Sequence, residues 1–237
     1  MVRPRADAAT RVTPSPRLVV PAYFHPAVHP GQWEWLAEHA AQVRLVVLNV
    51  ANGPGDGPEA PFKEATERLR SAGVPVVGYV DTNYGDRPAR EIMTEFEQYL
   101  DWYGVNGVCL DRVAAAAAKL AYFGTLTARV RKLGAQVVFF NHGTYPSSAY
   151  AEHADLLGTF EGPWNSYLKL NVPRWVTTWP AEKFYHVVYS VPPEKFSEAG
   201  QLATRRHAAA VYITERGGAN PYDGLPIDSR NKYVKFE

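Results

Sequence analysis

A short run of β-branched or aromatic residues, a loop rich in Gly, Pro and Asn, and an amphipathic stretch follow one another repeatedly from residue 17 onward. We count eight such rounds, with candidate strands at 17–23, 43–50, 74–80, 107–111, 136–141, 156–161, 184–190 and 209–215. Most of these runs are continuously apolar, which is typical of parallel strands that helices cover on both faces. Eight such units in roughly 220 residues close a barrel. The sequence therefore predicts an α/β protein with a (β/α)8 TIM barrel in a single domain.

Helix candidates between the strands include 31–42, 62–73, 89–104 and 118–134, and three of them end at a glycine that suits the C-cap position: Gly73, Gly104 and Gly134. A doubly wound open sheet would usually show a Gly-rich nucleotide-binding turn after the first strand, and the loop YFHPAVHPGQW has none. A two-layer α/β domain with miscounted strands is the alternative. No linker divides residues 17–230, so we expect one domain at 17–237 after a disordered or cloning-derived leader at 1–16.

Charge and composition exclude several classes of partner. The formal net charge is +1 and the basic residues are scattered, so we expect no nucleic acid partner and a neutral substrate. No apolar stretch approaches the length of a membrane span, and residues 1–16 lack the apolar core of a secretory signal. Cys109, the single cysteine, has no partner for an internal disulfide and is expected to be a small buried residue. We expect a monomer.

Polar side chains gather where the predicted strands end, and barrels of this kind carry their chemistry at those ends. Most of the predicted strands, by contrast, start with an apolar residue or a glycine. The substrate-binding candidates at the strand ends and in the following loops are Tyr23, His25, Asn52, Asp81, Tyr84, Arg112, Asn141, Trp164, Tyr189, Glu215 and Asn220. Aromatic side chains in these loops, Tyr222 included, could pack on the apolar faces of sugar rings.

Two carboxylates, Asp111 and Glu161, end the fourth and sixth predicted strands. Glycoside cleavage needs one ionised carboxylate at the anomeric carbon and one protonated carboxyl group at the leaving oxygen. We expect Asp111 to be the nucleophile or charge stabiliser, Glu161 to be the general acid/base, and the reaction to retain configuration. The alternative for either residue is an ion pair or a helix N-cap in a βα loop.

Other chemistries have weaker support. His25 and His29 are four residues apart, but Pro26 and Pro30 prevent the helix that would align them on a metal. The sequence has no G-x-S-x-G nucleophile elbow. Gly217 and Gly218 could hold a phosphate, although Glu215 and Asp223 would repel it. We therefore expect neither a metal nor a cofactor.

Seven motifs in order, VPAYFHP, LNVANGPG, GYVDTNYGDRP, GVCLDRV, FNHGTYP, TFEGPW and NPYDGLP, resemble the spherulin 4-like family from about Leu18 to Pro226. That family is related to microbial endo-α-1,4-galactosaminidases and N-acetylgalactosaminidases of exopolysaccharide clusters. The resemblance implies a (β/α)8 glycoside hydrolase with its acids at Asp111 and Glu161, and an α-linked galactosamine-containing polymer as substrate. It also implies cleft residues at Asn52, Tyr84, Asn141, Trp164 and Tyr189, and it favours a secreted protein.

The chain departs from the family pattern after the fourth strand, where characterised members carry Asp-Glu and this sequence has Asp111-Arg112. Arg112 could contact a different sugar or form a salt bridge with a neighbouring loop acid. Five alanines follow at 114–118. They favour a helix, and their side chains have no polar or aromatic group that could bind a ligand. We expect an endo-acting hydrolase of galactosamine- or N-acetylgalactosamine-containing exopolysaccharide, with a non-catalytic carbohydrate-binding barrel as the alternative.

Overall fold

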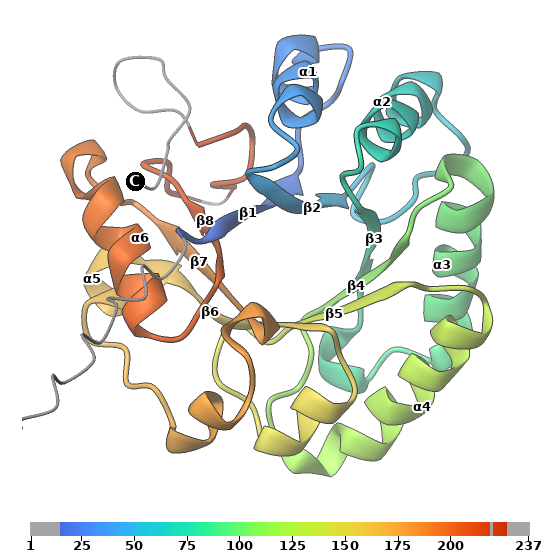
Figure 1. The fold of residues 1–237 in the computed structure, drawn as a ribbon. Coiled ribbons are helices and arrows are strands. Elements are labelled where there is room, and N and C mark those ends of the chain that lie inside the picture. Colours follow the sequence, from blue (N-terminus) through green and yellow to red (C-terminus); the bar gives the residue numbers. More distant parts are fainter. Residues whose placement is uncertain (1–14, 219, 227–237) are drawn as a thin grey trace, which may run out of the picture.

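The computed structural model describes residues 15–218 and 220–226. Eight strands form a closed barrel in sequence order, and every neighbouring pair is parallel, β1 with β8 included. The strands are β1 (Arg17–Ala22), β2 (Val43–Leu48), β3 (Val76–Asp81), β4 (Gly107–Asp111), β5 (Val137–Asn141), β6 (Leu156–Pro163), β7 (Phe184–Tyr189) and β8 (Ala210–Ile213). The predicted TIM barrel is confirmed (Figure 1). The predicted leader and the end of the domain, at 1–14 and 227–237, lie outside the described residues.

In the part of the chain that the structure describes, five helices of nine or more residues surround the barrel: α1 (Pro30–Glu38), α2 (Ala60–Ser71), α3 (Ala89–Tyr103), α4 (Leu120–Lys132) and α6 (Phe196–Arg205) (Figure 1). Their buried side chains recur at helical spacing, as in α3, where Ile92, Phe96, Tyr99 and Tyr103 face the strands. Gly104 ends α3 in the left-handed conformation with φ of 61°. Gly73 and Gly134 follow the last turns of α2 and α4 with positive φ, so the three predicted stop signals are confirmed.

The helical rounds are not complete, because no long helix follows β5 or β6. After β5 there is only the 3-10 segment η3 (Ser148–Glu152), and after β6 the four-residue α5 (Trp164–Tyr167) with η4 (Arg174–Thr178) and η5 (Ala181–Lys183). Pro163, Pro173 and Pro180 each precede one of these three short pieces. Proline fixes φ and lacks an N–H donor, which prevents one continuous helix here.

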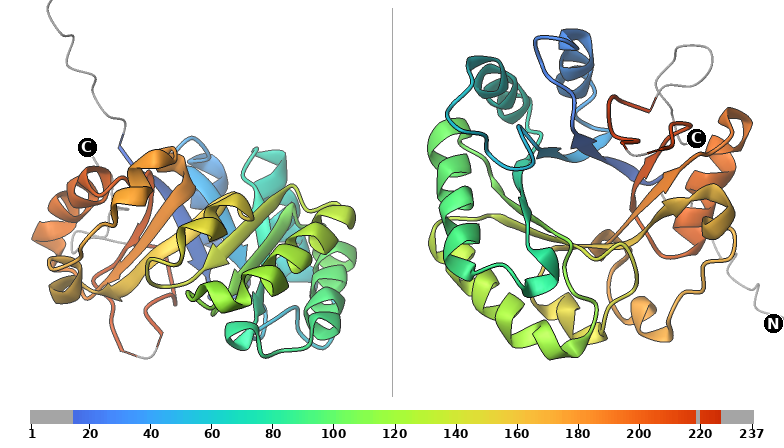
Figure 2. Two further views of the ribbon diagram at one scale, coloured as in Figure 1. Left: turned by 90° about the horizontal axis from the view of Figure 1, so that it is seen from below. Right: turned by 180° about the vertical axis from the view of Figure 1, so that it is seen from behind.

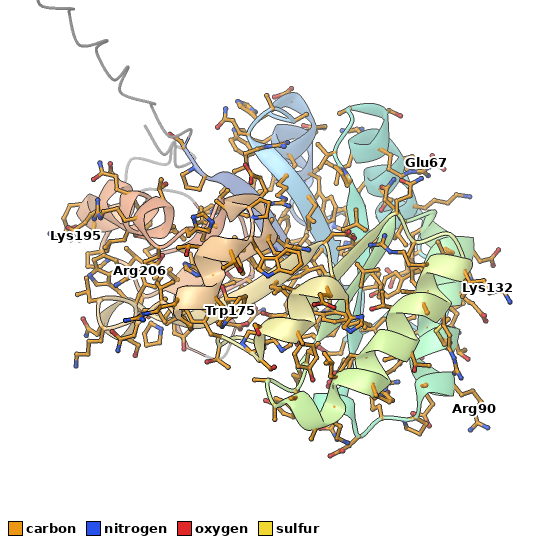
Figure 3. All side chains as sticks on the ribbon, turned by 60° about the horizontal axis from the view of Figure 1, so that its bottom comes forward. Glu67, Arg90, Lys132, Trp175, Lys195 and Arg206 are labelled. Atoms are coloured by element: carbon orange, nitrogen blue, oxygen red, sulfur yellow. The ribbon has the colours of Figure 1, made fainter. Side chains whose placement is uncertain are left out.

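Aromatic side chains cover β7 in place of the missing helix. His186 is fully buried on β7, and its two ring nitrogens bond to the hydroxyl groups of Tyr167 (2.9 Å) and Tyr145 (3.3 Å). The Arg206 guanidinium lies 4.5 Å from the centroid of the Tyr167 ring, and Trp175 packs against Phe184 nearby (Figure 3). Burial lowers the pKa of His186 to about 3, so this network is held by a neutral imidazole.

The loop after β4 differs from the helix that its alanines favour. Residues 112–116 form no helix, Ala117–Lys119 form the 3-10 segment η2, and α4 begins only at Leu120. The alanines contribute through their backbone, because the Ala115 carbonyl accepts a hydrogen bond from the Ser147 amide (2.9 Å) and the Ala116 carbonyl accepts one from the Tyr150 hydroxyl (3.0 Å). The loop is thus tied to the loop after β5, and both lie at the carboxyl ends of the strands (Figure 2).

No helix within residues 15–218 and 220–226 has both the length and the apolar composition needed to cross a membrane.

Candidate active site

One amide joins the two predicted catalytic carboxylates at the mouth of the barrel. The Nδ2 atom of Asn141, at the end of β5, donates to Oδ1 of Asp111 and to Oε2 of Glu161, each at 2.8 Å. The two carboxylate oxygens therefore lie no more than about 5.6 Å apart. Asp111 and Glu161 therefore face the same small volume, as expected from the sequence.

Glu161 faces this volume because β6 carries a bulge. In the pairing of β6 with β7, Gly158 and Phe160 oppose the consecutive residues Tyr185 and His186, so Thr159 is an extra residue. The bulge changes the alternation of the strand, so that Gly158 and Glu161 both face Asn141 while Phe160 packs outside, against Tyr167. A strand without this bulge would turn Glu161 away from Asp111.

Gly158 also provides the space for the Asn141 amide. The two residues are partners in the pairing of β5 with β6. A Cβ atom on residue 158 would lie 2.2 Å from Oδ1 of Asn141, well inside van der Waals contact. The Oδ1 atom is buried and has no hydrogen-bond partner, which leaves the amide held by its two carboxylate contacts.

Two tyrosines complete the hydrogen bonding of the carboxylate pair. The Tyr79 hydroxyl donates to Oδ2 of Asp111 at 3.0 Å, and the Tyr222 hydroxyl donates to Oε1 of Glu161. Burial raises the pKa of both phenols, and the neighbouring carboxylates raise them further, so both remain protonated donors. Tyr23 packs edge-on against both rings, with centroid distances of 5.7 Å to Tyr79 and 5.3 Å to Tyr222.

Asp111 lies in an electrostatic environment that favours its protonated form. Burial raises the pKa of Asp111, the negative charge of Glu161 raises it further, and the hydrogen bonds from Asn141 and Tyr79 oppose this rise. Asp111 therefore keeps a proton at higher pH than an exposed aspartate does.

Two hollows meet at this pair. An inner cavity of about 120 Å³ lies within the barrel and is lined by Pro21, Tyr23, Val47, Tyr79, Cys109, Asp111, Phe139, Asn141, Glu161, Tyr185, Val187 and Tyr222. An outer groove of about 270 Å³ is lined by Tyr84, Asp111, Arg112, Asn141, His142, Gly143, Glu161 and Tyr189. Both include Asp111, Asn141 and Glu161, so a ligand in the groove would reach the carboxylates directly.

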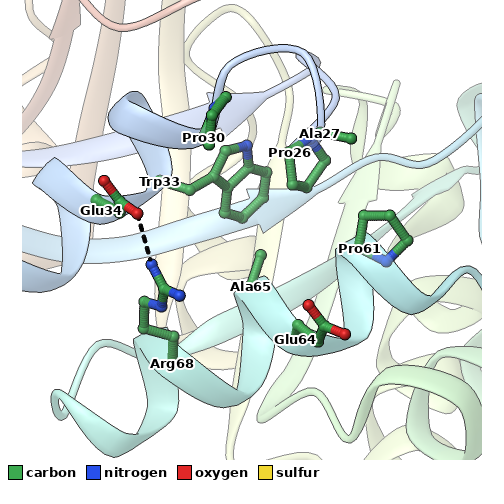
Figure 4. A pocket seen from close by; sticks show the side chains of 9 residues that line it. All are labelled: Pro26, Ala27, Pro30, Trp33, Glu34, Pro61, Glu64, Ala65 and Arg68. Carbon is green, nitrogen blue, oxygen red and sulfur yellow. Dashed lines mark hydrogen bonds and ion pairs between the residues drawn. The ribbon is translucent and has the colours of Figure 1, made fainter.

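A third hollow of about 260 Å³ lies between α1 and α2 (Figure 4). It is lined mainly by prolines, Trp33 and Ala65, and the exposed Arg68–Glu34 ion pair (3.1 Å) closes one side. It contains none of the predicted site residues, and its acids Glu34 and Glu64 are not joined by a shared donor. We therefore place the candidate site at the Asp111–Glu161 pair.

Arg112 lines the outer groove and forms a salt bridge with a neighbouring loop acid, one of the two alternatives that the sequence allows. Its Nη1 atom donates to Oδ2 of Asp81 at 2.8 Å. The other oxygen of Asp81 accepts from the Asn83 amide at 2.6 Å. Both Asp81 oxygens are therefore engaged by the protein, and Asp81 reaches the groove only through Arg112.

The other predicted substrate-binding residues divide into two groups. Those that line a hollow at the pair are Tyr23, Tyr84, Arg112, Asn141 and Tyr189. Those that line neither hollow are His25, Asn52, Asp81, Trp164, Glu215 and Asn220. His25 pairs with Glu59 (3.2 Å), and Trp164 is buried beside Tyr167. Asn220 contributes indirectly, because its Oδ1 atom accepts from the Tyr222 amide (3.1 Å).

Sequence reasoning missed Tyr79 and Tyr185 and named Tyr222 only as a loop aromatic. A signal for the first two was present, because side chains two residues apart on a strand share a face. Tyr79 precedes Asp81 by two positions and Tyr185 precedes Tyr189 by four, so each shares a strand face with a predicted site residue. Cys109 is buried and free, as predicted. Within the described part of the chain, no three His, Cys, Asp or Glu side chains gather as a metal ion would require.

Comparisons with known proteins agree with the resemblance seen in the sequence. Spherulin-4 of Physarum polycephalum is 30% identical over 170 residues, which are 70% of this chain and 50% of that protein, so the chain spans about half the length of this relative. The crystal structure of Aspergillus clavatus Sph3 in complex with GalNAc matches with a TM-score of 0.78 and 26% identity, over 90% of this chain and 94% of that one.

A GH18 chitinase from Pseudoalteromonas aurantia matches with a TM-score of 0.55 and 11% identity, over 87% of this chain and 96% of that one, which shows the shared fold alone. The family profile described as "Spherulation-specific family 4" matches residues 17–235. The chain therefore belongs to the spherulin 4 family.

Proposed function

We propose that this protein is an endo-acting glycoside hydrolase that cleaves an α-linked polysaccharide containing galactosamine or N-acetylgalactosamine. The observation that carries the proposal is the Asn141 amide, which holds one oxygen of Asp111 and one of Glu161 within about 5.6 Å of each other. Retaining glycosidases place their two carboxyl groups about 5 to 5.5 Å apart, and inverting ones about 6.5 to 9.5 Å. The geometry therefore supports retention.

The chemistry needs one carboxyl group that donates a proton and one carboxylate that attacks the anomeric carbon. From the sequence, Asp111 is expected to attack and Glu161 to donate. The raised pKa of Asp111 supports the opposite assignment, with Asp111 as the proton donor, because a general acid needs a raised pKa. Azide distinguishes the two assignments by the anomeric configuration of the glycosyl azide that it forms. Relative to the substrate, this configuration is inverted when the missing residue is the nucleophile and retained when it is the general acid/base.

The similarity to Sph3 supports a carbohydrate-active barrel and an amino sugar as the ligand, because that structure holds GalNAc. The open outer groove of about 270 Å³ supports the accommodation of a chain. The aromatic side chains around it, Tyr84 and Tyr189, are suited to the apolar faces of sugar rings.

The test is the release of reducing ends from acetylated and deacetylated galactosaminogalactan by the wild type, Asp111→Asn and Glu161→Gln. We expect the wild type to release oligosaccharides, and each variant to lose at least about a thousandfold in rate, as when essential catalytic groups are removed. Proton NMR of the first product gives the anomeric configuration. Arg68→Gln, which breaks an exposed ion pair between α1 and α2, is the matched control and should retain full activity (Figure 4).

The second candidate is a non-catalytic carbohydrate-binding barrel. The Arg112–Asp81 ion pair favours this candidate, because Arg112 neutralises the charge of Asp81, which is then not free to act as a further catalytic acid. In that case the wild type binds the polysaccharide but releases no reducing ends. Hydrolysis by the wild type that depends on Asp111 and Glu161 excludes this candidate.

A further inference from the structure

Tyr84 is an exposed aromatic side chain on the wall of the outer groove. Its relative exposure is 52%, and among the described residues the other exposed large hydrophobic side chains are Val28, Leu133 and Leu168. None of those three lines the groove, whereas Tyr84 shares it with Asp111 and Glu161. Its ring is therefore accessible to a ligand that occupies the groove and reaches the carboxylates.

The backbone at Tyr84 is held in an unfavourable conformation. Tyr84 has φ of 56° and ψ of 26°, and Asn83 has φ of 45°. Both values lie in the left-handed region, which residues with a Cβ atom avoid, and two such residues in succession are unusual. Strain of this kind persists only where surrounding contacts enforce it, and it concentrates at functional sites.

Arg112 supplies those contacts with both its backbone and its side chain. Its carbonyl oxygen accepts from the Tyr84 amide (2.7 Å) and from the Thr82 hydroxyl (2.8 Å). Its guanidinium donates to Asp81 (2.8 Å) and to Oδ1 of Asn83 (2.7 Å). The guanidinium carbon also lies 4.9 Å from the centroid of the Tyr84 ring. Arg112 itself adopts φ of 51°, so it is part of the same strained unit.

We propose that Tyr84 is a stacking platform for a sugar unit bound next to the one at the carboxylate pair, and that Arg112 is the positioning residue that holds this platform. The guanidinium fork is occupied by Asp81 and Asn83, which makes it an internal clamp, in contrast to the direct substrate contact expected from the sequence. The groove beside Tyr84 carries carboxylate, amide and aromatic groups, the combination that recognises the hydroxyl edges and apolar faces of sugars.

This inference rests on the proposed function only in taking a carbohydrate chain as the ligand, and a binding experiment tests it apart from hydrolysis. Calorimetry with the N-acetylgalactosamine monosaccharide and the α-1,4-linked hexasaccharide is done in an Asp111→Asn background, so that the ligands survive. Tyr84→Ala should weaken hexasaccharide binding about tenfold and leave monosaccharide binding within about twofold, whereas Tyr84→Phe should bind both as the parent does.

The role of Arg112 is read from a double-mutant cycle. Arg112→Gln should weaken hexasaccharide binding nearly as much as Tyr84→Ala, and the combination of both should weaken it little further. If the two effects multiply, Arg112 contacts the sugar itself and the positioning role is refuted. Arg68→Gln, which also breaks an exposed arginine ion pair, is the matched control, and thermal unfolding of every variant reports on folding.

Two outcomes separate this inference from the proposed hydrolase. Hexasaccharide binding that depends on Tyr84, together with no hydrolysis by the wild type, supports the platform and refutes the hydrolase. Hydrolysis by the wild type with hexasaccharide binding unchanged in Tyr84→Ala refutes the platform alone. Absence of any oligosaccharide binding also overturns the platform.

Discussion

Asn141→Asp is the substitution that most directly tests the shared amide. The new side chain has the same shape, but it replaces a donor that lies 2.8 Å from both Asp111 and Glu161 with a third carboxylate. At that distance, and with an effective dielectric constant of about 20, two full like charges repel by about 6 kcal/mol. The site avoids this repulsion by binding a proton, so the pKa of the cluster rises.

The sign and size of the effect on stability follow from this rise. A carboxyl group whose pKa in the folded state lies above its unfolded value of about 3.9 costs nothing below that pH and destabilises the fold as the pH rises through the folded value. At pH 7 the site limits the cost by binding a proton. The cost is then about 4 kcal/mol, which is about 1.4 kcal/mol for each of the roughly three pH units between the unfolded pKa of about 3.9 and pH 7. For a chain of this length each kcal/mol lowers Tm by about 2 to 4 °C, so we expect Tm to fall by about 10 °C.

The assay is thermal unfolding of the wild type, Asn141→Asp and Asn141→Ala at several pH values from about 4.5 to 8. The deficit of Asn141→Asp should grow steeply with pH. That of Asn141→Ala should grow less, because alanine removes the donor that lowers the pKa of Asp111 but adds no charge. Asn106→Asp is the control, since Oδ1 of Asn106 accepts from the Val76 amide at 3.0 Å and an aspartate preserves that contact. A deficit of Asn141→Asp that is independent of pH, or no larger than that of Asn106→Asp, would refute the reasoning.

Gly158→Ala places a Cβ atom 2.2 Å from Oδ1 of Asn141, so we expect a loss of about 1 to 3 kcal/mol in the free energy of unfolding and a large loss of kcat/KM, measured by denaturant titration and by the reducing-end assay. Tyr222→Phe removes the donor to Glu161 and should lower kcat by about 10- to 100-fold with little change in KM; an unchanged kcat would show that the hydroxyl is dispensable. Burial lowers the pKa of His142 to about 4 and of His186 to about 3. Because both folded values lie below the unfolded value of about 6.5, stability should fall as the pH drops below that value, and neither imidazole should titrate by NMR between about pH 5 and 8.

The barrel itself could be predicted from the sequence because its signal is long and repeated. Eight apolar runs and three helix-ending glycines agree with one another, and each reflects local physical chemistry. The missing helices after β5 and β6 could not be counted in this way. Pro163, Pro173 and Pro180 predict that a helix after β6 is interrupted. They do not predict that aromatic side chains packed around His186 cover β7 instead.

At the site, the sequence predicts which acids end the strands but not which donors hold them. Asn141 and Asp111 lie at strand ends, where topology alone brings them together. Tyr222 lies far along the chain from Glu161, and no periodicity relates the two residues. The ion pair between Arg112 and Asp81 could not be predicted from sequence spacing either. It depends on a loop conformation in which Tyr84 and Arg112 have positive φ, which these residue types do not favour.

The bulge in β6 links these points, because it determines whether the site exists at all. With regular alternation from Gly158, Phe160 would face the barrel interior and Glu161 would face outward, which would leave Asp111 without a partner carboxylate. One extra residue, Thr159, reverses that phase. The pairing of β6 is therefore irregular at the position where Glu161 must face the barrel interior. The geometry of the carboxylate pair depends on the backbone of residues 158–161 as much as on the carboxylates themselves.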